Sequence, residues 1–187
     1  PPTISGEISD TRVGETLSFT PTTFDSNGDD LIFSISDKPE WLSFNTSTGS
    51  LNGKAPETAL GDNYSFSIIV SDGQSQASLG PLTFSVIPPI FFIKIELNDM
   101  DLYRDMDLEL KGCFEDKDED ECSESEEILT LNDNGVYKFE NGIKSGNSFE
   151  LKVERDPARQ ECILELSEGV VETEDIIIKS NCSQDES

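Results

Sequence analysis

The 187-residue sequence contains no histidine, only one tryptophan and two methionines, and no long apolar run. Without histidine, catalytic triads that use an imidazole base and metal sites with imidazole ligands are excluded. Glycines occur singly in turns, so no phosphate-binding loop or dinucleotide fingerprint is present. Carboxylates are so numerous that no pair can be assigned to glycoside hydrolysis. We therefore expect a chain that is not an enzyme.

Basic residues are also scarce, with 13 Lys and Arg against 39 Asp and Glu and a formal net charge of −26. Eleven acidic and three basic residues precede Pro88, and 28 acidic and 10 basic residues follow it. This balance excludes nucleic acid and anionic membrane surfaces as partners. It is compatible with divalent cations, while solubility alone is the alternative explanation for the second half. Membrane insertion is not expected, because a spanning helix needs about 20 apolar residues.

Apolar and polar residues alternate in short runs through the first half of the chain. Four runs share this pattern, at residues 15–20, 31–36, 64–70 and 82–86. Strict alternation is typical of strands with one buried face. Turn-forming residues rich in Gly, Asn and Asp separate the runs, and no segment has a helical period. The first half is therefore predicted to be a β-sandwich.

Pro88 and Pro89 mark the expected domain boundary, because proline donates no ladder hydrogen bond and stiffens the chain. We expect one domain over residues 1–88 and a second, acidic domain over residues 89–187. Further strands of the second domain are expected at 92–97, 107–112, 127–132, 136–140, 148–154, 161–166 and 174–179. Ser183 to Ser187 are expected to form a frayed tail. The fold class predicted from these patterns is all-β, with two tandem β-sandwiches.

All four cysteines lie in the second half, at Cys113, Cys122, Cys162 and Cys182. An even number of cysteines without histidine favours disulfides over metal thiolates. A zinc site made of the four thiolates is the alternative, although the CxxC spacing of such sites is absent. Because disulfides form in oxidising compartments, we expect a secreted or cell-surface location. The chain starts at Pro1 without a signal peptide, so we expect a piece of a longer protein.

Several motifs of the first half occur together in a characteristic order. They are Val13-Gly14-Glu15, Asp25-Ser26-Asn27-Gly28-Asp29-Asp30-Leu31, Pro39-Glu40-Trp41-Leu42-Ser43-Phe44, Thr48-Gly49-Ser50-Leu51-Asn52-Gly53 and Val70-Ser71-Asp72-Gly73. This series resembles the immunoglobulin-like, dystroglycan-type cadherin-like repeat of bacteria over nearly all of residues 1–88. The resemblance implies a Greek-key sandwich of the immunoglobulin or cadherin type. Such repeats occur in tandem in adhesins, and beside catalytic modules in polysaccharide-degrading systems.

The loop after residue 24 has the chemistry of a calcium site. Asp25, Asn27 and Asp29 place three oxygen-bearing side chains at alternate positions, and Gly28 permits the tight turn between them. Calcium takes six to eight oxygen ligands, so a ligand from elsewhere is needed. The resemblance implies Asp72 as that ligand. Glu7 and Glu15 are further candidates to complete the shell, although their spacing does not indicate it. The family's loop usually has a carboxylate at the position of Asn27, and a plain Asx-rich turn is the alternative interpretation.

The second half contains a different set of motifs. These motifs are similar to a second, divergent bacterial extracellular repeat. They are Asn134-Gly135-Val136-Tyr137-Lys138-Phe139, Ser145-Gly146-Asn147-Ser148-Phe149, Pro157, Gln160-Glu161-Cys162 and Cys182. That resemblance implies a disulfide between Cys162 and Cys182, and local pairing of Cys113 with Cys122. Asp116, Asp118 and Asp120 mimic the start of a calcium loop but lack its glycine, so a solvated acidic loop is the preferred interpretation.

These features favour a calcium-stabilised module pair that serves in adhesion, as a spacer or as a presenting unit. A carbohydrate-binding module is the alternative, and the receptor-binding tip of an adhesin is a third possibility. The expected partners are a surface protein, a polysaccharide, or neighbouring modules of the same chain. Trp41 could stack on a sugar, but its position between Pro39 and Leu42 favours a role in the core.

Overall fold

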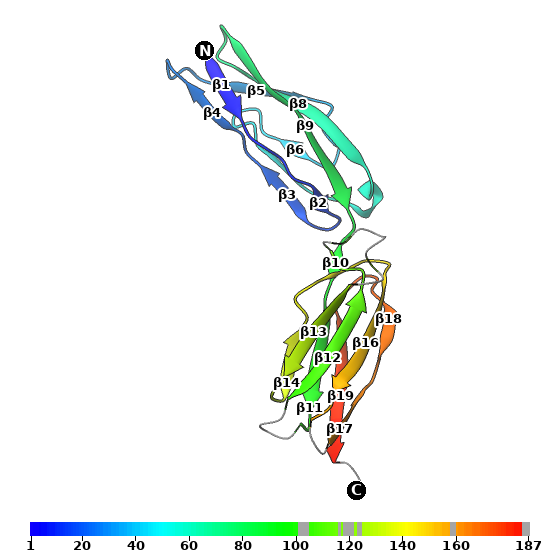
Figure 1. The fold of residues 1–187 in the computed structure, drawn as a ribbon. Coiled ribbons are helices and arrows are strands. Elements are labelled where there is room, and N and C mark those ends of the chain that lie inside the picture. The colour runs from blue at the N-terminus through cyan, green and yellow to red at the C-terminus, as the bar shows by residue number, and fades with distance from the viewer. Residues whose placement is uncertain (101–104, 116, 118–121, 123–124, 158–159, 185–187) are drawn as a thin grey trace. The chain divides into compact units, whose positions relative to one another are not determined.

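The computed structural model describes the whole chain except residues 101–104, 116, 118–121, 123–124, 158–159 and 185–187 (Figure 1). The chain divides into two compact units, which we call unit 1 (Pro1–Pro89) and unit 2 (Ile90–Ser187). Each unit has its own cluster of buried apolar side chains. Both units consist of β-strands, and the one helical segment among the described residues is a single 3-10 turn, η1 (Glu57–Ala59).

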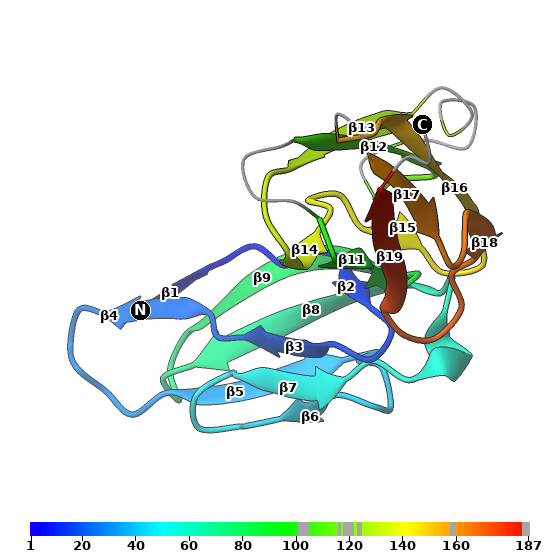
Figure 2. The same cartoon turned by 90° about the horizontal axis from the view of Figure 1, so that it is seen from below.

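Unit 1 contains nine strands: β1 (Pro2–Ser5), β2 (Thr11–Arg12), β3 (Thr16–Phe19), β4 (Thr22–Asp25), β5 (Ile32–Ser36), β6 (Ser43–Phe44), β7 (Leu51–Lys54), β8 (Asn63–Ser71) and β9 (Gln76–Ile87). The main sheet has the order β2-β9-β8-β5, and a three-stranded sheet has the order β3-β7-β6. Strands β1 and β4 form a separate antiparallel pair beside the N-terminus, as Figure 2 shows. Strand β2 pairs with β9 in parallel, whereas the other pairs of the unit are antiparallel.

The core of unit 1 follows from the alternation in its sequence. Along β8, Phe66, Ile68 and Val70 are buried, while the residues between them lie at or near the surface. Phe33 on β5 and Phe84 on β9 are buried on the same side of the main sheet. Period-two patterning therefore places one face of each strand in the core, as expected for a sandwich.

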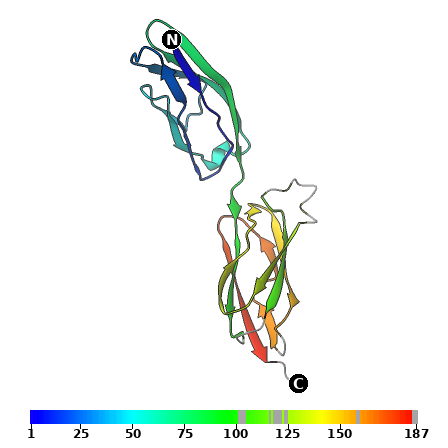
Figure 3. The same ribbon diagram turned by 60° about the vertical axis from the view of Figure 1, so that its left-hand side comes forward.

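Unit 2 contains ten strands: β10 (Ile90–Phe91), β11 (Ile93–Asn98), β12 (Met106–Gly112), β13 (Glu126–Leu131), β14 (Gly135–Lys138), β15 (Ile143–Lys144), β16 (Ser148–Arg155), β17 (Gln160–Leu164), β18 (Glu168–Val170) and β19 (Ile176–Gln184). Two four-stranded sheets have the orders β14-β11-β19-β17 and β13-β12-β16-β18, and β10 pairs with β15. In Figure 3 the red strand β19, which leads to the C-terminus, runs alongside the green β11. This pair is parallel, so unit 2 joins its first long strand to its last.

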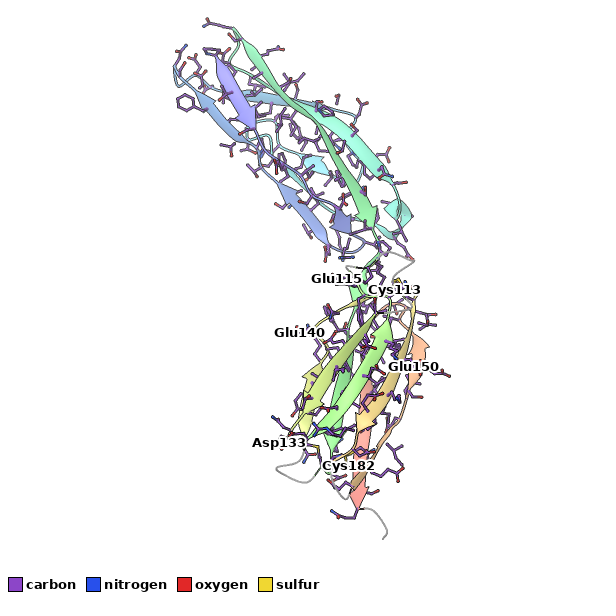
Figure 4. All side chains as sticks on the ribbon, viewed as in Figure 1. Cys113, Glu115, Asp133, Glu140, Glu150 and Cys182 are labelled. Atoms are coloured by element: carbon purple, nitrogen blue, oxygen red, sulfur yellow. A yellow bond between two sulfur atoms is a disulfide. The ribbon has the colours of Figure 1, made fainter. Side chains whose placement is uncertain are left out.

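The two disulfides of unit 2 are present, Cys113–Cys122 and Cys162–Cys182. Figure 4 shows Cys113 and Cys182 at opposite ends of the unit. Cys162 and Cys182 are direct cross-strand partners in β17 and β19, and both are buried in the core. The pairing that the second resemblance implies is therefore found, and the alternative of a four-thiolate zinc site is wrong.

The structure adds elements that the alternation did not predict. These elements are strands of four residues or fewer, which is too few for a clear period of alternation between apolar and polar residues. They are β1, β2, β4, β6, β7, β10, β15 and β18. The expected frayed tail is partly wrong, because Ser183 and Gln184 belong to β19 and pair with Glu161 and Gln160. The acidic loop of Asp116, Asp118 and Asp120 lies outside the described residues.

Candidate metal centre

Strand pairing brings two distant aspartates to the same end of unit 1. Asp25 is the last residue of β4 and pairs with Pro2 of β1, so it lies beside the N-terminus. Asp72 directly follows β8, whose last residue, Ser71, pairs with Ile32 at the start of β5. Because the loop after Asp25 leads into β5, both aspartates lie where this loop and the end of β8 meet. The local sequence sets each turn, and the pairing of β5 with β8 sets their proximity.

The carboxylate of Asp25 is held in a fixed orientation by its own loop. Its Oδ1 accepts hydrogen bonds from the backbone N–H of Asn27 (2.9 Å) and from that of Asp29 (3.3 Å). This is the Asx-type turn that Asp forms readily at the start of a loop. Its Oδ2 is buried and accepts no hydrogen bond among the described residues. One oxygen therefore holds the loop, and the other remains available for a cation.

The two carboxylate oxygens of Asp72 also have different roles, one in the turn and one facing the site. Its Oδ1 accepts the backbone N–H of Gln74 at 2.7 Å and that of Ser75 at 2.5 Å. These bonds fix the turn between β8 and β9. The Oδ2 of Asp72 points toward the same place as that of Asp25, because both contact the terminal nitrogen of Pro1.

The backbone nitrogen of Pro1, the first residue of this sequence, lies at this point. The nitrogen of Pro1 lies 3.4 Å from Oδ2 of Asp25 and 3.8 Å from Oδ2 of Asp72. Both carboxylate side chains are only 3% exposed. A buried carboxylate costs much free energy unless it is paired, so two of them facing one point form a site that requires positive charge.

The pKa values of both aspartates are lowered. For Asp25, burial raises the pKa, but the N–H groups of Asp29 and Asn27 together with the terminal ammonium outweigh burial. For Asp72, the N–H groups of Ser75 and Gln74 lower the pKa most, burial opposes them, the ammonium lowers the pKa further and the neighbouring charge of Asp25 raises it. Both groups are therefore ionised at neutral pH, which is the state that a metal ligand needs.

The four residues predicted as ligands thus behave in two different ways. Asp25 and Asp72 converge, whereas the side chains of Asn27 and Asp29 are exposed and their backbone N–H groups face Asp25. Oδ1 of Asn27 accepts a hydrogen bond from the hydroxyl of Ser26. Among the residues that the structure describes, no three His, Cys, Asp or Glu side chains are clustered to hold a metal ion. A calcium ion here would need further oxygens from the loop or from water.

The sequence analysis did not identify the position of Pro1 beside this pair. No motif signals it, because the contact depends on the pairing of β1 with β4. Glu15, named above as a further ligand candidate, lies in the turn between β2 and β3, where its backbone bonds to Arg12 and Ala55. The geometry therefore selects Asp25 and Asp72 as the centre of the site.

Comparison with known families supports the resemblance of the first half. A family model described as "Putative Ig domain" matches residues 1–87. No curated protein matches the chain. The immunoglobulin-like character of residues 1–87 is therefore confirmed, and the two all-β units confirm the predicted fold class. Within the described residues, no helix is both long and apolar enough to cross a membrane.

Several solved structures are similar in part. A "putative alpha-galactosidase" of Bacteroides fragilis has 16% identity and a TM-score of 0.39, with 49% of this chain and 20% of that chain covered. An endo-fucoidan hydrolase has 14% identity and a TM-score of 0.40, with 96% and 28% covered. Human protocadherin-24 EC1-2 has 14% identity and a TM-score of 0.36, with 97% of each chain covered. The chain thus spans 20–28% of the two hydrolase chains, and none of these similarities carries a functional argument.

Proposed function

We propose that this chain, whose residues 1–87 match the "Putative Ig domain" family, is a pair of non-catalytic extracellular modules stabilised by calcium in unit 1. The modules serve in adhesion, as a spacer or as a presenting unit for a longer surface or secreted protein. The observation that carries the calcium proposal is the convergence of Oδ2 of Asp25 and Oδ2 of Asp72 on one point, on side chains that are only 3% exposed.

The donor set suits a hard divalent cation. Both available atoms are carboxylate oxygens, the ligand type that calcium prefers. Asp25 and Asp72 would hold the ion directly. Asn27 and Asp29 are near enough in sequence to complete the shell together with backbone carbonyls and water. Magnesium fits this irregular set less well, because it requires strict octahedral geometry at shorter distances.

Calcium should stabilise unit 1 by mass action. A ligand that binds only the folded state at 100 times its Kd contributes about 2.7 kcal/mol. Each kcal/mol shifts the melting temperature of a 60–100-residue domain by roughly 4–8 °C. Calorimetry of the full chain in millimolar calcium should therefore show the unit 1 transition about 10 °C or more above its value in chelator. Magnesium at the same concentration should give a much smaller rise.

Variants localise the effect to the pair. Asp25→Asn and Asp72→Asn should each remove most of the calcium-dependent rise, because each removes one charge but keeps an oxygen for the turn. Asp29→Ala is expected to reduce the rise if its side chain completes the shell. Asp30→Asn is the matched control, since it removes the same charge from an exposed neighbour in the same loop.

Acetylation of Pro1 provides a second test, because it replaces the amino group of the piece by the amide that a preceding residue would form. Acetylation of the amino group of Pro1 removes the charge that lies between the two carboxylates. Calcium then has no internal competitor, so its affinity for the acetylated chain should be higher, as isothermal titration calorimetry would measure. Superimposable melts in calcium and in chelator, for both forms of the chain, would show that the loop is only a turn.

Three features support the remaining parts of the proposal. The two disulfides of unit 2 favour an oxidising, extracellular location. The absence of histidine argues against the commonest acid–base catalysis. A carbohydrate-binding module, the alternative function, stacks sugars on exposed aromatic side chains. Phe24 is the one largely exposed aromatic side chain among the described residues, which favours the spacer or adhesive role.

A further inference from the structure

A hollow of about 430 Å³ lies in unit 1, away from the aspartate pair. Its walls come from the turn at residues 37–41, from the η1 segment, and from Asp62 and Tyr64 at the start of β8. This volume is within the usual range of small-ligand pockets. The hollow combines two aromatic residues with several carboxylates, a composition that indicates a specific class of ligand.

The aromatic wall is held rigidly by the core. The ring of Trp41 packs edge-on against Tyr64 and Phe84, with centroid distances of 6.2 and 6.0 Å. Tyr64 in turn stacks on Phe84 at 5.2 Å. The preferred role of Trp41 in core packing is therefore consistent with these contacts, and Trp41 also lines the hollow. A wall fixed by packing costs little conformational entropy when a ligand binds.

The hydrogen-bond donors of this wall are already in use. The indole N–H of Trp41 donates to the hydroxyl of Tyr64 at 3.4 Å, and that hydroxyl donates to Oδ2 of Asp62 at 2.9 Å. The ammonium of Lys38 donates to the backbone carbonyls of Leu42 (2.7 Å) and Pro39 (3.4 Å). The hydroxyl of Thr58 at the rim is the neutral side-chain donor that remains.

Acceptors, by contrast, are in excess. Within the described part of the chain, the carboxylates of Asp37 and Glu40 have no hydrogen bond or ion pair, and Asp62 uses one of its two oxygens. Three acidic residues and one basic residue line the hollow, so its net charge is negative. A ligand that fits this arrangement supplies N–H donors and positive charge, and offers an apolar body to the aromatic wall.

We infer that this hollow binds the side-chain cation of a basic segment of a partner protein, an arginine guanidinium or a lysine ammonium. Both groups are pure donors, so they match a site that offers acceptors. Their apolar stems can pack on Trp41 while the charge reaches Asp62 and Glu40. A neutral sugar matches less well, because each hydroxyl also needs a donor from the site. The negative charge of unit 1 would in addition attract a basic partner.

The single tryptophan of the chain makes the test direct, because its fluorescence reports on this hollow alone. Agmatine, which carries a guanidinium on a four-carbon chain, serves as the arginine probe, and n-butylamine as the lysine probe. Both should change the fluorescence of Trp41 saturably in the full chain, and should shift its indole N–H resonance. Equal concentrations of sodium chloride should not do so. Glucosamine tests an amino sugar as the source of the cation, and N-acetylglucosamine tests a neutral sugar.

Substitutions connect the signal to the carboxylates. Glu40→Gln should weaken agmatine binding by roughly two- to fivefold, as the loss of one exposed ion pair predicts. Glu7→Gln is the matched control, since Glu7 is also exposed but lies outside the hollow, and it should leave binding unchanged. Asp62→Asn should weaken binding at least as much as Glu40→Gln. A melt of each variant establishes that it is folded.

Three results would overturn the inference. They are the absence of a saturable change with either amine, binding of either sugar as tight as that of agmatine, and equal binding by Glu40→Gln and Glu7→Gln. The inference does not rest on the calcium proposal. Asp72→Asn should remove most of the calcium effect and still bind agmatine, so the two ideas fail separately.

Discussion

The disulfide between Cys162 and Cys182 should account for a large part of the stability of unit 2. It joins β17, at the edge of its sheet, to β19, which pairs with β11 inside the sheet. The two cysteines are 20 residues apart in sequence. In the chain-entropy model, closure of a loop of this length stabilises the folded state by about 3 kcal/mol. Because both cysteines are buried, the loss of sulfur packing in a double alanine variant adds to this cost.

The double variant Cys162→Ala/Cys182→Ala should therefore lower the melting temperature of unit 2 by roughly 12–25 °C, at about 4–8 °C per kcal/mol. Scanning calorimetry of the full chain measures this shift. The transition of unit 1 serves as the internal reference, because the two buried clusters share no residue. Removal of Cys113–Cys122 is the matched control. Its sequence separation is only 9, so the model predicts a smaller loss, of about 2.5 kcal/mol.

The reasoning is refuted if the transition of unit 2 moves by less than a few degrees in the Cys162→Ala/Cys182→Ala variant. It is equally refuted if unit 1 moves as far as unit 2, because the disulfide constrains only unit 2. A larger shift for the control variant than for this variant would show that loop length does not determine the effect.

Two further predictions concern unit 1. Gly49→Ala should destabilise it far more than Gly14→Ala in thermal melts. Both glycines have a positive φ, of 73° and 84°, but only at Gly49 would the new Cβ lie 2.6 Å from the ring of Phe33. The second prediction is acid sensitivity in calcium-free buffer. The pKa values of Asp25 and Asp72 are lowered from the ordinary 3.8, so their contribution to stability is complete above this value and is lost as the pH falls through the lowered values. Melts between about pH 6 and pH 2 should show this loss in the native chain and a smaller one in the Asp25→Asn/Asp72→Asn variant; equal losses in both would contradict it.

The sequence determined the architecture because the signals for strands are local. The alternation of apolar and polar residues along 64–70 predicts the buried row of Phe66, Ile68 and Val70, because successive side chains in a strand point to opposite faces. Turn residues delimit the strands in the same local way. Gly49, for example, adopts the left-handed backbone that glycine tolerates. The disulfide pairing, in contrast, came from resemblance, because four cysteines allow three connectivities and spacing does not choose among them.

The short strands could not be predicted, because they depend on their partners. Strand β1 has four residues and begins with a proline, and its pairing with β4 defines it. This pairing also places Pro1 beside Asp25, a contact that no composition or motif contains. For the same reason, the loop chemistry named Asp25, Asn27 and Asp29 alike, and Asp72 came only from the resemblance. The fold separated the converging Asp25 and Asp72 from the exposed side chains of Asn27 and Asp29.

The hollow beside Trp41 shows the same division. From the sequence alone, the position of Trp41 between Pro39 and Leu42 favoured core packing as the interpretation. Only the tertiary structure decided that the indole N–H and the hydroxyl of Tyr64 are used internally, and that Asp62 stands at the end of this chain of hydrogen bonds. Residue types and local periodicity are properties of the chain itself. Which oxygen of a carboxylate accepts no hydrogen bond, and which donors of a pocket remain unused, depends on residues that are distant in sequence. Those residues come together only when the strands pair.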